Sequence, residues 1–218
     1  MIKNKSRKGW FGASDTAMIM GNWSTATFLS WWMVKLGLAE SFGGNRYTRA
    51  GTEYEHKILD AIGVKKKDRQ IRIKKLRLRV NLDGEDKECI YEVKTHKTAV
   101  FKACKAYWQQ AQVEMFATKK KLKIVAYHMT DENYVNYFLP IDSGRVTYHP
   151  IEYDAAWIRE KYLPRLRYLA ACLKKGEMPN ESDFEQFVAR LQNEKTGGLL
   201  ALGRRLLGRI RKDEGQAA

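Results

Sequence analysis

The sequence predicts an α/β fold, in which helices flank a central mixed β-sheet. The first observation is the order of the periodic segments: helical patterns come first, then strands, a long helix, two more strands and a second long helix. The second is that strands and helices do not alternate regularly and no GxGxxG or Walker-type motif occurs, which disfavours a doubly wound dinucleotide fold. With 218 residues, 44% of them hydrophobic, the chain can form one domain over residues 1–180, followed by a basic helical extension over 181–218.

Three helical patterns open the chain. The first covers 14–20 and stops at a Gly-Asn pair. The second covers 25–37, with Ser and Thr available as caps before it and Gly37 at its end. The third covers 48–63, and its apolar residues recur at helical spacing: Tyr54, Ile58, Leu59 and Ile62.

The strand region begins with residues 70–84, whose apolar positions alternate in two phases. The phase slips at Lys74-Lys75, which indicates either a bulge or a bend between two strands. Residues 89–93 form the next strand, and Asp83-Gly84 supplies turn chemistry between the two runs.

The second half of the chain follows the same logic. A long helix is predicted over 100–118, and two strands over 121–129 and 133–140. A second long helix over 154–176 is bent or interrupted at Pro164. The remaining segments are a short helix over 183–192 and a basic amphipathic stretch over 199–212, which suits a protein partner, DNA, a membrane surface or local packing as a basic tail.

The charge balance indicates a polyanionic partner. The formal net charge is +15 and the pI is near 9.7, so the field of the protein attracts nucleic acid first and anionic membrane second; a basic surface kept for solubility is the plain alternative. Three scattered cysteines form no metal-binding set and fit a reducing cytoplasm. No signal-peptide core and no apolar run long enough for a membrane helix is present, so a membrane role is not expected.

The stretch 81–94, NLDGEDKECIYEVK, carries the strongest chemical signal. Asp83 at a strand end and Glu92 on the next strand can converge on one Mg²⁺, and the carbonyl of Val93 is a further hard oxygen ligand. Lys94 shares a strand face with Glu92 and can orient water or stabilise negative charge; it becomes a base only if its pKa is lowered substantially. The alternative is a solvated hairpin with a surface Glu–Lys pair, and residues 85–88 are interpreted as solvated turn in either case.

The pattern Asp…Glu-x-Lys resembles the metal site of the PD-(D/E)XK nuclease superfamily. Further segments occur in the order expected of the phage lambda exonuclease family, also called YqaJ-like viral recombinases: residues 9–38, GTEYE, LDG, EVK and YWQQAQVEMFAT. The resemblance covers roughly residues 7–125 and implies a restriction-endonuclease-like core. This chain has Leu82 where the family usually has proline before the aspartate, which alters strand-end rigidity and leaves the ligand intact.

The resemblance also implies roles on two helices. GTEYE matches the Gly-x-x-Tyr-Glu pattern, which assigns Glu55 to complete the metal site, with Glu53 as a competitor and a solvated helix carboxylate as the alternative. YWQQAQVEM matches Tyr-x-x-Gln-x-Gln, so Gln110 and Gln112 are candidate catalytic residues. Gln112 is the favoured one, and Tyr107 packs or stacks nearby; otherwise the glutamines line the polar side of a core helix.

A binding pocket for the 5′-phosphate of DNA is implied at the N-terminus. Arg7 and Ser14 match the family spacing, an arginine fork suits a terminal phosphate, and plain capping at Ser14 or Asp15 is the alternative. Asn81 stands where the family has a serine, and Lys97 and Lys102 follow the Glu-x-Lys in an uncertain register. The aromatic pair at 31–32 is interpreted as core, and Trp23 is the better candidate for touching DNA.

The function implied is an Mg²⁺-dependent 5′→3′ double-strand DNA exonuclease, with Mn²⁺ as a possible substitute. It would release mononucleotides from duplex ends and leave 3′ single-stranded overhangs for recombination by strand annealing. The resemblance further implies a homotrimer, a single-strand annealing protein as partner, and a phage or prophage protein in the cytoplasm of a bacterial host. The alternatives are an endonuclease or flap nuclease on the same site, or a non-catalytic DNA-binding module with a degenerate nuclease fold.

Overall fold

The computed structural model describes residues 8–40 and 43–193. By internal contacts the chain divides into two compact units, Met1–Met178 and Pro179–Ala218. The candidate site lies entirely in the first unit.

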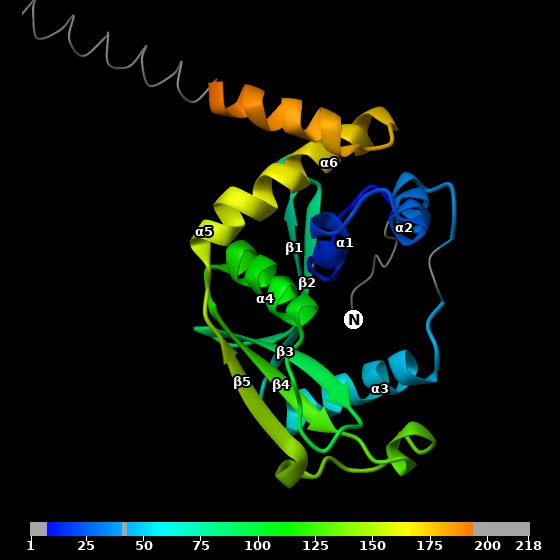
Figure 1. Cartoon of the computed structure of the whole chain (residues 1–218). Helices are drawn as coiled ribbons and strands as arrows, with labels where there is room; N and C mark the ends of the chain where they lie inside the picture. The colour runs from blue at the N-terminus through cyan, green and yellow to red at the C-terminus, as the bar shows by residue number, and fades with distance from the viewer. Residues whose placement is uncertain (1–7, 41–42, 194–218) are drawn as a thin grey trace, which may run out of the picture. The chain divides into compact units, whose positions relative to one another are not determined.

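A five-stranded sheet forms the centre of the first unit, and its strands lie in chain order (Figure 1). The pairs β1–β2, β2–β3 and β4–β5 are antiparallel, whereas β3–β4 is parallel. The sheet is therefore mixed, and the predicted α/β fold is confirmed. The strands are β1 (Lys66–Ile73), β2 (Leu78–Glu85), β3 (Cys89–His96), β4 (Lys121–His128) and β5 (Val146–Ile151).

Helices cover both faces of this sheet. The parallel pair β3–β4 needs a crossover, which α4 (Lys105–Thr118) supplies. Because successive strand residues point to opposite faces, Glu92 and Lys94 face α4, while Val93 faces the other side. On that other side α3 (Arg46–Ala61) buries its apolar stripe against β3 and β4, in a core formed by Ala50, Tyr54, Ile58, Leu59, Val93, Val125 and Tyr127.

The N-terminal helices follow the sequence closely. A 3₁₀ turn η1 (Ala13–Asp15) leads into α1 (Thr16–Met20). The next helix, α2 (Ala26–Leu36), begins where Thr25 accepts a hydrogen bond from the backbone N–H of Phe28. It ends at Gly37, whose φ of 76° is the left-handed conformation that glycine adopts most easily.

The phase slip in residues 70–84 is a connection between two strands. β1 begins at Lys66, and a 3₁₀ turn η2 (Lys74–Leu76) followed by Arg77 at a φ of 48° joins it to β2. The predicted bend between two strands is therefore confirmed, and the alternative of a bulge within one strand is wrong.

The β2–β3 hairpin turns later than predicted. Asp83 and Gly84 lie inside β2, and the turn is residues 86–88, where Asp86 Oδ1 accepts the N–H groups of Glu88 and Cys89. An aspartate that accepts two backbone N–H groups organises a turn without glycine. The prediction of a solvated turn is also wrong for Glu85, which is 4% exposed and forms ion pairs with Arg69 and Lys120.

Residues 133–140 are not a strand, contrary to prediction. They form a 3₁₀ turn η3 (Glu132–Tyr134) and a loop that packs on α3, where the hydroxyl of Tyr54 donates to the carbonyl of Asn136 over 2.8 Å. Their aromatic periodicity reflects packing against the helix, and a further 3₁₀ turn, η4 (Ser143–Arg145), leads into β5.

The second long helix is interrupted where expected. It consists of α5 (Ala155–Trp157), a π-helical turn η5 (Ile158–Tyr162) and α6 (Leu163–Lys175), with Pro164 in the first turn of α6. In the second unit, Asn180 caps a helix over 181–193. The amphipathic segment 199–212 lies outside the described residues, and none of the described helices is long and apolar enough to cross a membrane.

Candidate active site

Asp83, Glu92 and Lys94 meet where β2 and β3 diverge. The two strands pair at Gly84↔Tyr91 and Glu85↔Ile90. One residue further, the side chain of Asp83 replaces the ladder, because its Oδ2 accepts the backbone N–H of Val93 over 2.9 Å. The strands open at this point, and the Asp83 carboxylate is held at the edge of the opening.

The Glu92 carboxylate is buried and asymmetrically bonded. Its Oε1 accepts from Lys94 Nζ over 2.7 Å and from Gln110 Nε2 over 2.6 Å. Its Oε2 is fully buried and has no hydrogen-bond donor within the described part of the chain. A buried anionic oxygen without a partner is costly, and a cation would satisfy it.

This donor set fits a hard divalent cation. Asp83 and Glu92 offer carboxylate oxygens, and Val93, whose N–H donates to Asp83, offers a backbone carbonyl. Mg²⁺ prefers such oxygen ligands and usually keeps several waters. The residues present therefore suit the metal that the sequence predicts.

Lys94 is held as an ammonium. Its Nζ also donates to Gln110 Oε1 over 3.2 Å and lies 4.9 Å from the centre of the Tyr107 ring. Burial alone would lower the pKa of Lys94, but the charges of Glu92 and Asp83 outweigh burial and raise it. Lys94 therefore does not have the lowered pKa that a lysine base requires.

Three carboxyl groups near Lys94 have raised pKa values. Burial, followed by the charge of Glu92, raises the pKa of Glu55 from 4.5 to about 7. The same two causes, in the same order, raise the pKa values of Asp83 and of Glu114 well above their ordinary range. Mutually repelling carboxylates with a common surplus of negative charge are the electrostatic pattern of a cation site.

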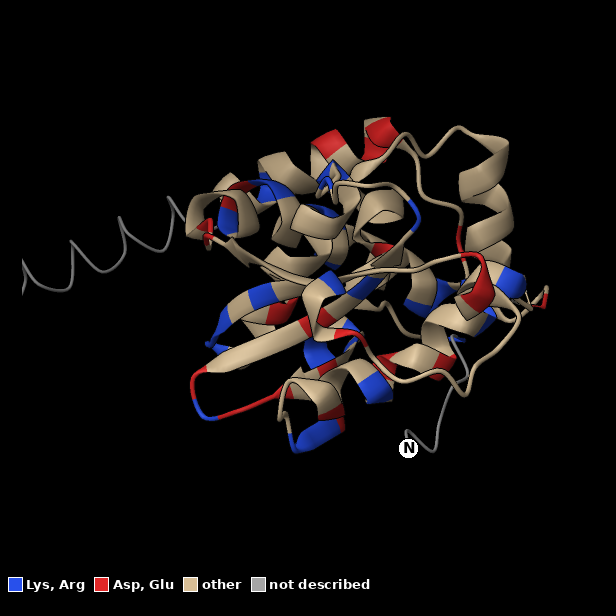
Figure 2. Ribbon diagram, turned by 90° about the horizontal axis from the view of Figure 1, so that it is seen from below, with Lys and Arg blue, Asp and Glu red and all other residues tan. Residues whose placement is uncertain are grey.

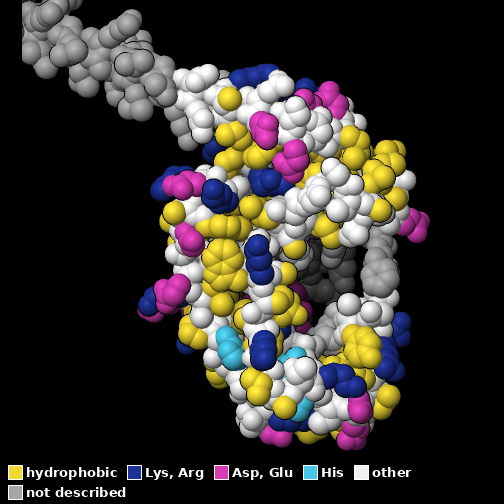
Figure 3. All heavy atoms as spheres, viewed as in Figure 1, with side chains coloured by type: hydrophobic (Ala, Val, Ile, Leu, Met, Phe, Trp, Pro, Cys, Tyr) yellow, Lys and Arg dark blue, Asp and Glu magenta, His cyan; other side chains and the backbone are white. Residues whose placement is uncertain are grey.

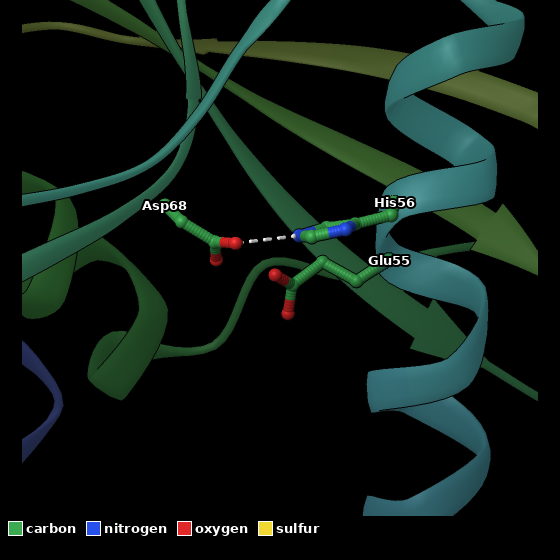
Figure 4. Close-up of side chains that lie close together, drawn as sticks. All are labelled: Glu55, His56 and Asp68. Carbon is green, nitrogen blue, oxygen red and sulfur yellow. Dashed lines mark ion pairs between the residues drawn. The ribbon is translucent and has the colours of Figure 1, made fainter. Parts of the chain in front are cut away.

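Glu55 lies close to two unpredicted side chains, those of His56 and Asp68 (Figure 4). Within the described residues, the one group of three His, Cys, Asp or Glu side chains with ligand atoms within 4.8 Å of one another is Glu55, His56 and Asp68. His56 Nε2 and Asp68 Oδ2 form an ion pair of 3.2 Å. The structure therefore does not bring Glu55, Asp83 and Glu92 together that closely, which repulsion between buried carboxylates explains.

A cavity of about 660 Å³ leads to Asp83 and Glu55. Ser14 and Asn81 line it as well, so two of the predicted phosphate-binding residues share one space with two of the predicted metal ligands. Figure 3 shows this side of the molecule hollowed between the segments that contain α2 and α3. Glu92 and Lys94 are not among the residues that line the cavity.

Ser14 lines this cavity, and the hydrogen bonds of the adjacent residue hold it in place. Its neighbour Asp15 accepts from the backbone N–H of Gly12 over 2.6 Å and from Trp31 Nε1 over 2.9 Å, and it pairs with Lys35, whose side chain is 1% exposed. Asp15 therefore caps the turn, and Ser14 presents its side chain to solvent.

Two predicted site residues are placed elsewhere. Gln112 is fully buried and joins α4 to the segment after β5, since its amide donates to the carbonyl of Glu152 and accepts from the N–H of Asp154, both over 2.7 Å. Two residues along a helix point to different sides, so Gln110 faces the acidic site and Gln112 does not. Trp23 is 3% exposed and stacks on Tyr168, so it is a core residue and its ring is not available to DNA.

The remaining predicted DNA contacts are dispersed. Lys97 is exposed and forms an ion pair with Asp131. Lys102 is exposed beside a separate pocket of about 530 Å³, lined also by His96, Phe101 and Tyr107. Arg7 lies outside the described residues.

Two unpredicted residues have signals that the sequence carried. Arg79 is 7% exposed and lines the cavity, and its spacing of two from Asn81 and four from Asp83 places all three on one strand face. Glu114 is fully buried four residues after Gln110, which is the spacing of one helix face. His56 and Asp68 had no such signal, because their contact joins α3 to β1.

The fold is an α/β arrangement of a five-stranded mixed sheet with flanking helices. A particular solved structure with a similar fold is an alkaline exonuclease, LHK-Exo from Laribacter hongkongensis, at a TM-score of 0.53 and 17% identity over 88% of this chain and 95% of that chain. At this identity the likeness concerns the fold. SSO0001 aligns at a TM-score of 0.41 and 12% identity over 83% of this chain and 80% of that chain, too weak to support an argument. No family model and no curated protein matches the sequence.

Proposed function

We propose that this protein is a divalent-cation-dependent deoxyribonuclease that hydrolyses phosphodiester bonds. One observation carries the proposal: Asp83 and Glu92 lie at the opening between β2 and β3, and Glu92 presents a buried oxygen that has no donor among residues 8–40 and 43–193. The likeness in fold to an alkaline exonuclease and the order of the sequence motifs support the same reading.

Each residue of the candidate site has a distinct task in this proposal. Asp83, Glu92 and the carbonyl of Val93 hold Mg²⁺, with Mn²⁺ as a substitute, and Glu55 completes the site through the cavity it shares with Asp83. Bound there, the cation would neutralise phosphate charge and make a water ligand more acidic. Lys94 stabilises negative charge on the phosphate and orients water, and Gln110 fixes the positions of Lys94 and Glu92.

DNA is the proposed substrate because of charge and access. Lys and Arg outnumber Asp and Glu by 40 to 25, and Figure 2 shows them on helices, strands and loops rather than on one element. Such a surface attracts the phosphate backbone without sequence preference. The cavity with Ser14, Asn81 and Arg79 at its wall then receives the strand end.

The finer proposal is a 5′→3′ exonuclease on duplex ends. Arg7 and Ser14 would hold the terminal 5′-phosphate. Ser14 shares its cavity with Asn81 and with the buried Arg79. Mononucleotides would leave and a 3′ single-stranded overhang would remain. The homotrimer and the single-strand annealing partner rest on the sequence resemblance.

Digestion of linear and covalently closed circular duplex DNA tests the activity. With Mg²⁺, the protein should degrade 5′-phosphorylated linear duplex, and EDTA or Asp83→Ala should abolish the reaction. The closed circle should stay intact, whereas nicking of the circle would favour the endonuclease alternative. If wild type and Asp83→Ala both leave linear DNA intact with Mg²⁺ and with Mn²⁺, the non-catalytic DNA-binding alternative holds.

Duplexes with a 5′-phosphate or a 5′-hydroxyl test the binding pocket. Arg7→Ala and Ser14→Ala should lower the cleavage rate on the phosphorylated end and have a smaller effect on the hydroxyl end. Equal losses on both ends would contradict the assignment of these residues to the terminal phosphate.

A further inference from the structure

The buried carboxyl group of Glu114 has no task in the proposed reaction. It lies on the face of α4 that contacts the site, its residue is 0% exposed, and its Oε2 has no hydrogen-bond donor within the described residues. Burying a carboxyl group is costly, and an apolar side chain of the same size usually packs at least as well. A function for Glu114 must therefore follow from what its other oxygen contacts.

That contact is the amide of Gln110. Gln110 Nε2 donates to Glu114 Oε1 over 2.8 Å and to Glu92 Oε1 over 2.6 Å, which uses both of its hydrogens. Its own Oε1 accepts from Lys94 Nζ over 3.2 Å. A flipped amide would direct its oxygen at two carboxyl groups and its NH₂ at an ammonium, so Glu114 helps to fix one orientation.

The fixed amide determines which oxygen of Glu92 is available. Gln110 and Lys94 both bind Oε1, so Oε2 has no donor in the described part of the chain and is available to a cation. If the amide lost its anchor on Glu114, it could rotate away from Glu92 Oε1, and Glu92 could turn. Outer contacts of this kind orient metal ligands in many metalloproteins.

We propose that Glu114 is a positioning residue: through the amide of Gln110 it orients Glu92 for the divalent cation and Lys94 for the phosphate. This inference rests on the proposed nuclease function for its kinetic consequences, and on geometry alone for its effect on cation binding. Glu114 touches neither the substrate nor the cation.

The test is a double-mutant cycle between Glu114→Met and Gln110→Ala, with two readouts. The first is the Mn²⁺ dissociation constant from titration calorimetry without DNA, and the second is kcat and KM on linear duplex with Mg²⁺. Glu114→Met should weaken Mn²⁺ binding and lower kcat by about 10- to 100-fold, as for other residues that orient metal ligands, with little change in KM. In a Gln110→Ala background the same substitution should have less than about a twofold effect, because residues that act through one another are not additive.

Two further variants separate positioning from charge and from folding. Glu114→Gln keeps an acceptor for the Gln110 amide and should recover most of the binding and kcat, within about threefold of wild type. Gln112→Met is the matched control: it removes another fully buried, hydrogen-bonded side chain of α4 that points away from the site, and should lower Tm without changing Mn²⁺ affinity. Glu114→Met should not lower Tm, because it removes a buried acid.

Three results would overturn the proposal. A full effect of Glu114→Met in the Gln110→Ala background would show that Glu114 acts independently of the amide. Equal losses in Glu114→Met and Glu114→Gln would show that its charge matters instead. A Glu114→Met protein that does not fold, or that resembles Gln112→Met in every readout, would give Glu114 a structural role. The nuclease proposal fails separately if wild type binds Mn²⁺ and cleaves no DNA.

Discussion

At the scale of residues, the candidate site is a cluster of acidic side chains whose negative charges repel one another. Glu55, Asp83 and Glu114 all have pKa values raised by burial and by the charge of Glu92, while Lys94 is the ammonium among them. Such an arrangement destabilises the metal-free protein at neutral pH and favours binding of a divalent cation.

The stability of the metal-free protein should therefore depend on pH through Glu55. Its pKa is about 7 when folded and 4.5 otherwise, so its contribution to stability is full below pH 4.5 and is lost as the pH rises through 7. The difference amounts to roughly 3 kcal/mol at most for Glu55 alone. In thermal unfolding with EDTA, Tm of wild type should fall between pH 5 and 8 more steeply than Tm of Glu55→Gln.

Parallel curves for the two proteins would contradict this assignment of the pKa of Glu55. Adding Mg²⁺ at pH 8 supplies the control, since a bound cation offsets the same repulsion and should raise Tm of wild type.

The sequence predicted the carboxylates of the site better than their surroundings. Asp83, Glu92 and Lys94 are singled out by the sequence resemblance, and a strand period with a hairpin places them together. Gln110 and Gln112 could be ranked only by the phase of α4 against β3, which no local pattern reveals, and the weaker candidate is the one that contacts Glu92. The raised pKa of Lys94 depends on charged side chains that only the fold brings near it, so the sequence could not predict it.

At the scale of elements, the contact between α3 and β2 positions Glu55 relative to Asp83. Gly84 permits it, because a Cβ there would lie 2.7 Å from Leu59 Cδ2 and 2.9 Å from Val64 Cγ1, and both neighbours are buried. Gly84, the residue after Asp83, is thus the point of close approach between helix and strand.

Gly84→Ala should accordingly lower the free energy of unfolding by roughly 1–3 kcal/mol, as overpacking in a core does. Urea unfolding measures this change. Gly43→Ala is the matched control, since a Cβ there meets no atom within 4 Å. Equal stability of the two variants would mean that α3 can shift without cost, and cleavage by Gly84→Ala would then be unaffected.

Elements with local end signals were predicted well, and elements defined by distant packing were not. α2 has its cap at Thr25 and its stop at Gly37, both visible in the sequence. In contrast, 133–140 has strand-like periodicity and is a loop on α3, while β5 gains its place by pairing with β4. The hairpin turn forms at Asp86 and not at the predicted Asp83-Gly84, because the Asp86 carboxylate accepts two backbone N–H groups.

At the scale of the whole molecule, the charge of +15 is the feature through which the proposed nuclease would attract DNA. Duplex binding should weaken by at least about tenfold between 50 and 200 mM salt, because each phosphate contact releases counterions. Fluorescence anisotropy of a labelled duplex in EDTA measures the affinity without cleavage. An affinity independent of salt would contradict the electrostatic account of substrate capture.

We propose above all that Glu92 holds the cation that permits hydrolysis, through the oxygen that has no donor among the described residues. The most direct test is release of nucleotides from 5′-phosphorylated linear duplex with Mg²⁺, by wild type, Glu92→Gln and Glu88→Gln. Glu88 is the control, because it is an exposed glutamate on the turn of the same hairpin. We predict a loss of roughly 1000-fold for Glu92→Gln, which corresponds to several kcal/mol of lost charge stabilisation, and less than about a twofold change for Glu88→Gln. Release by Glu92→Gln at the wild-type rate would contradict the account.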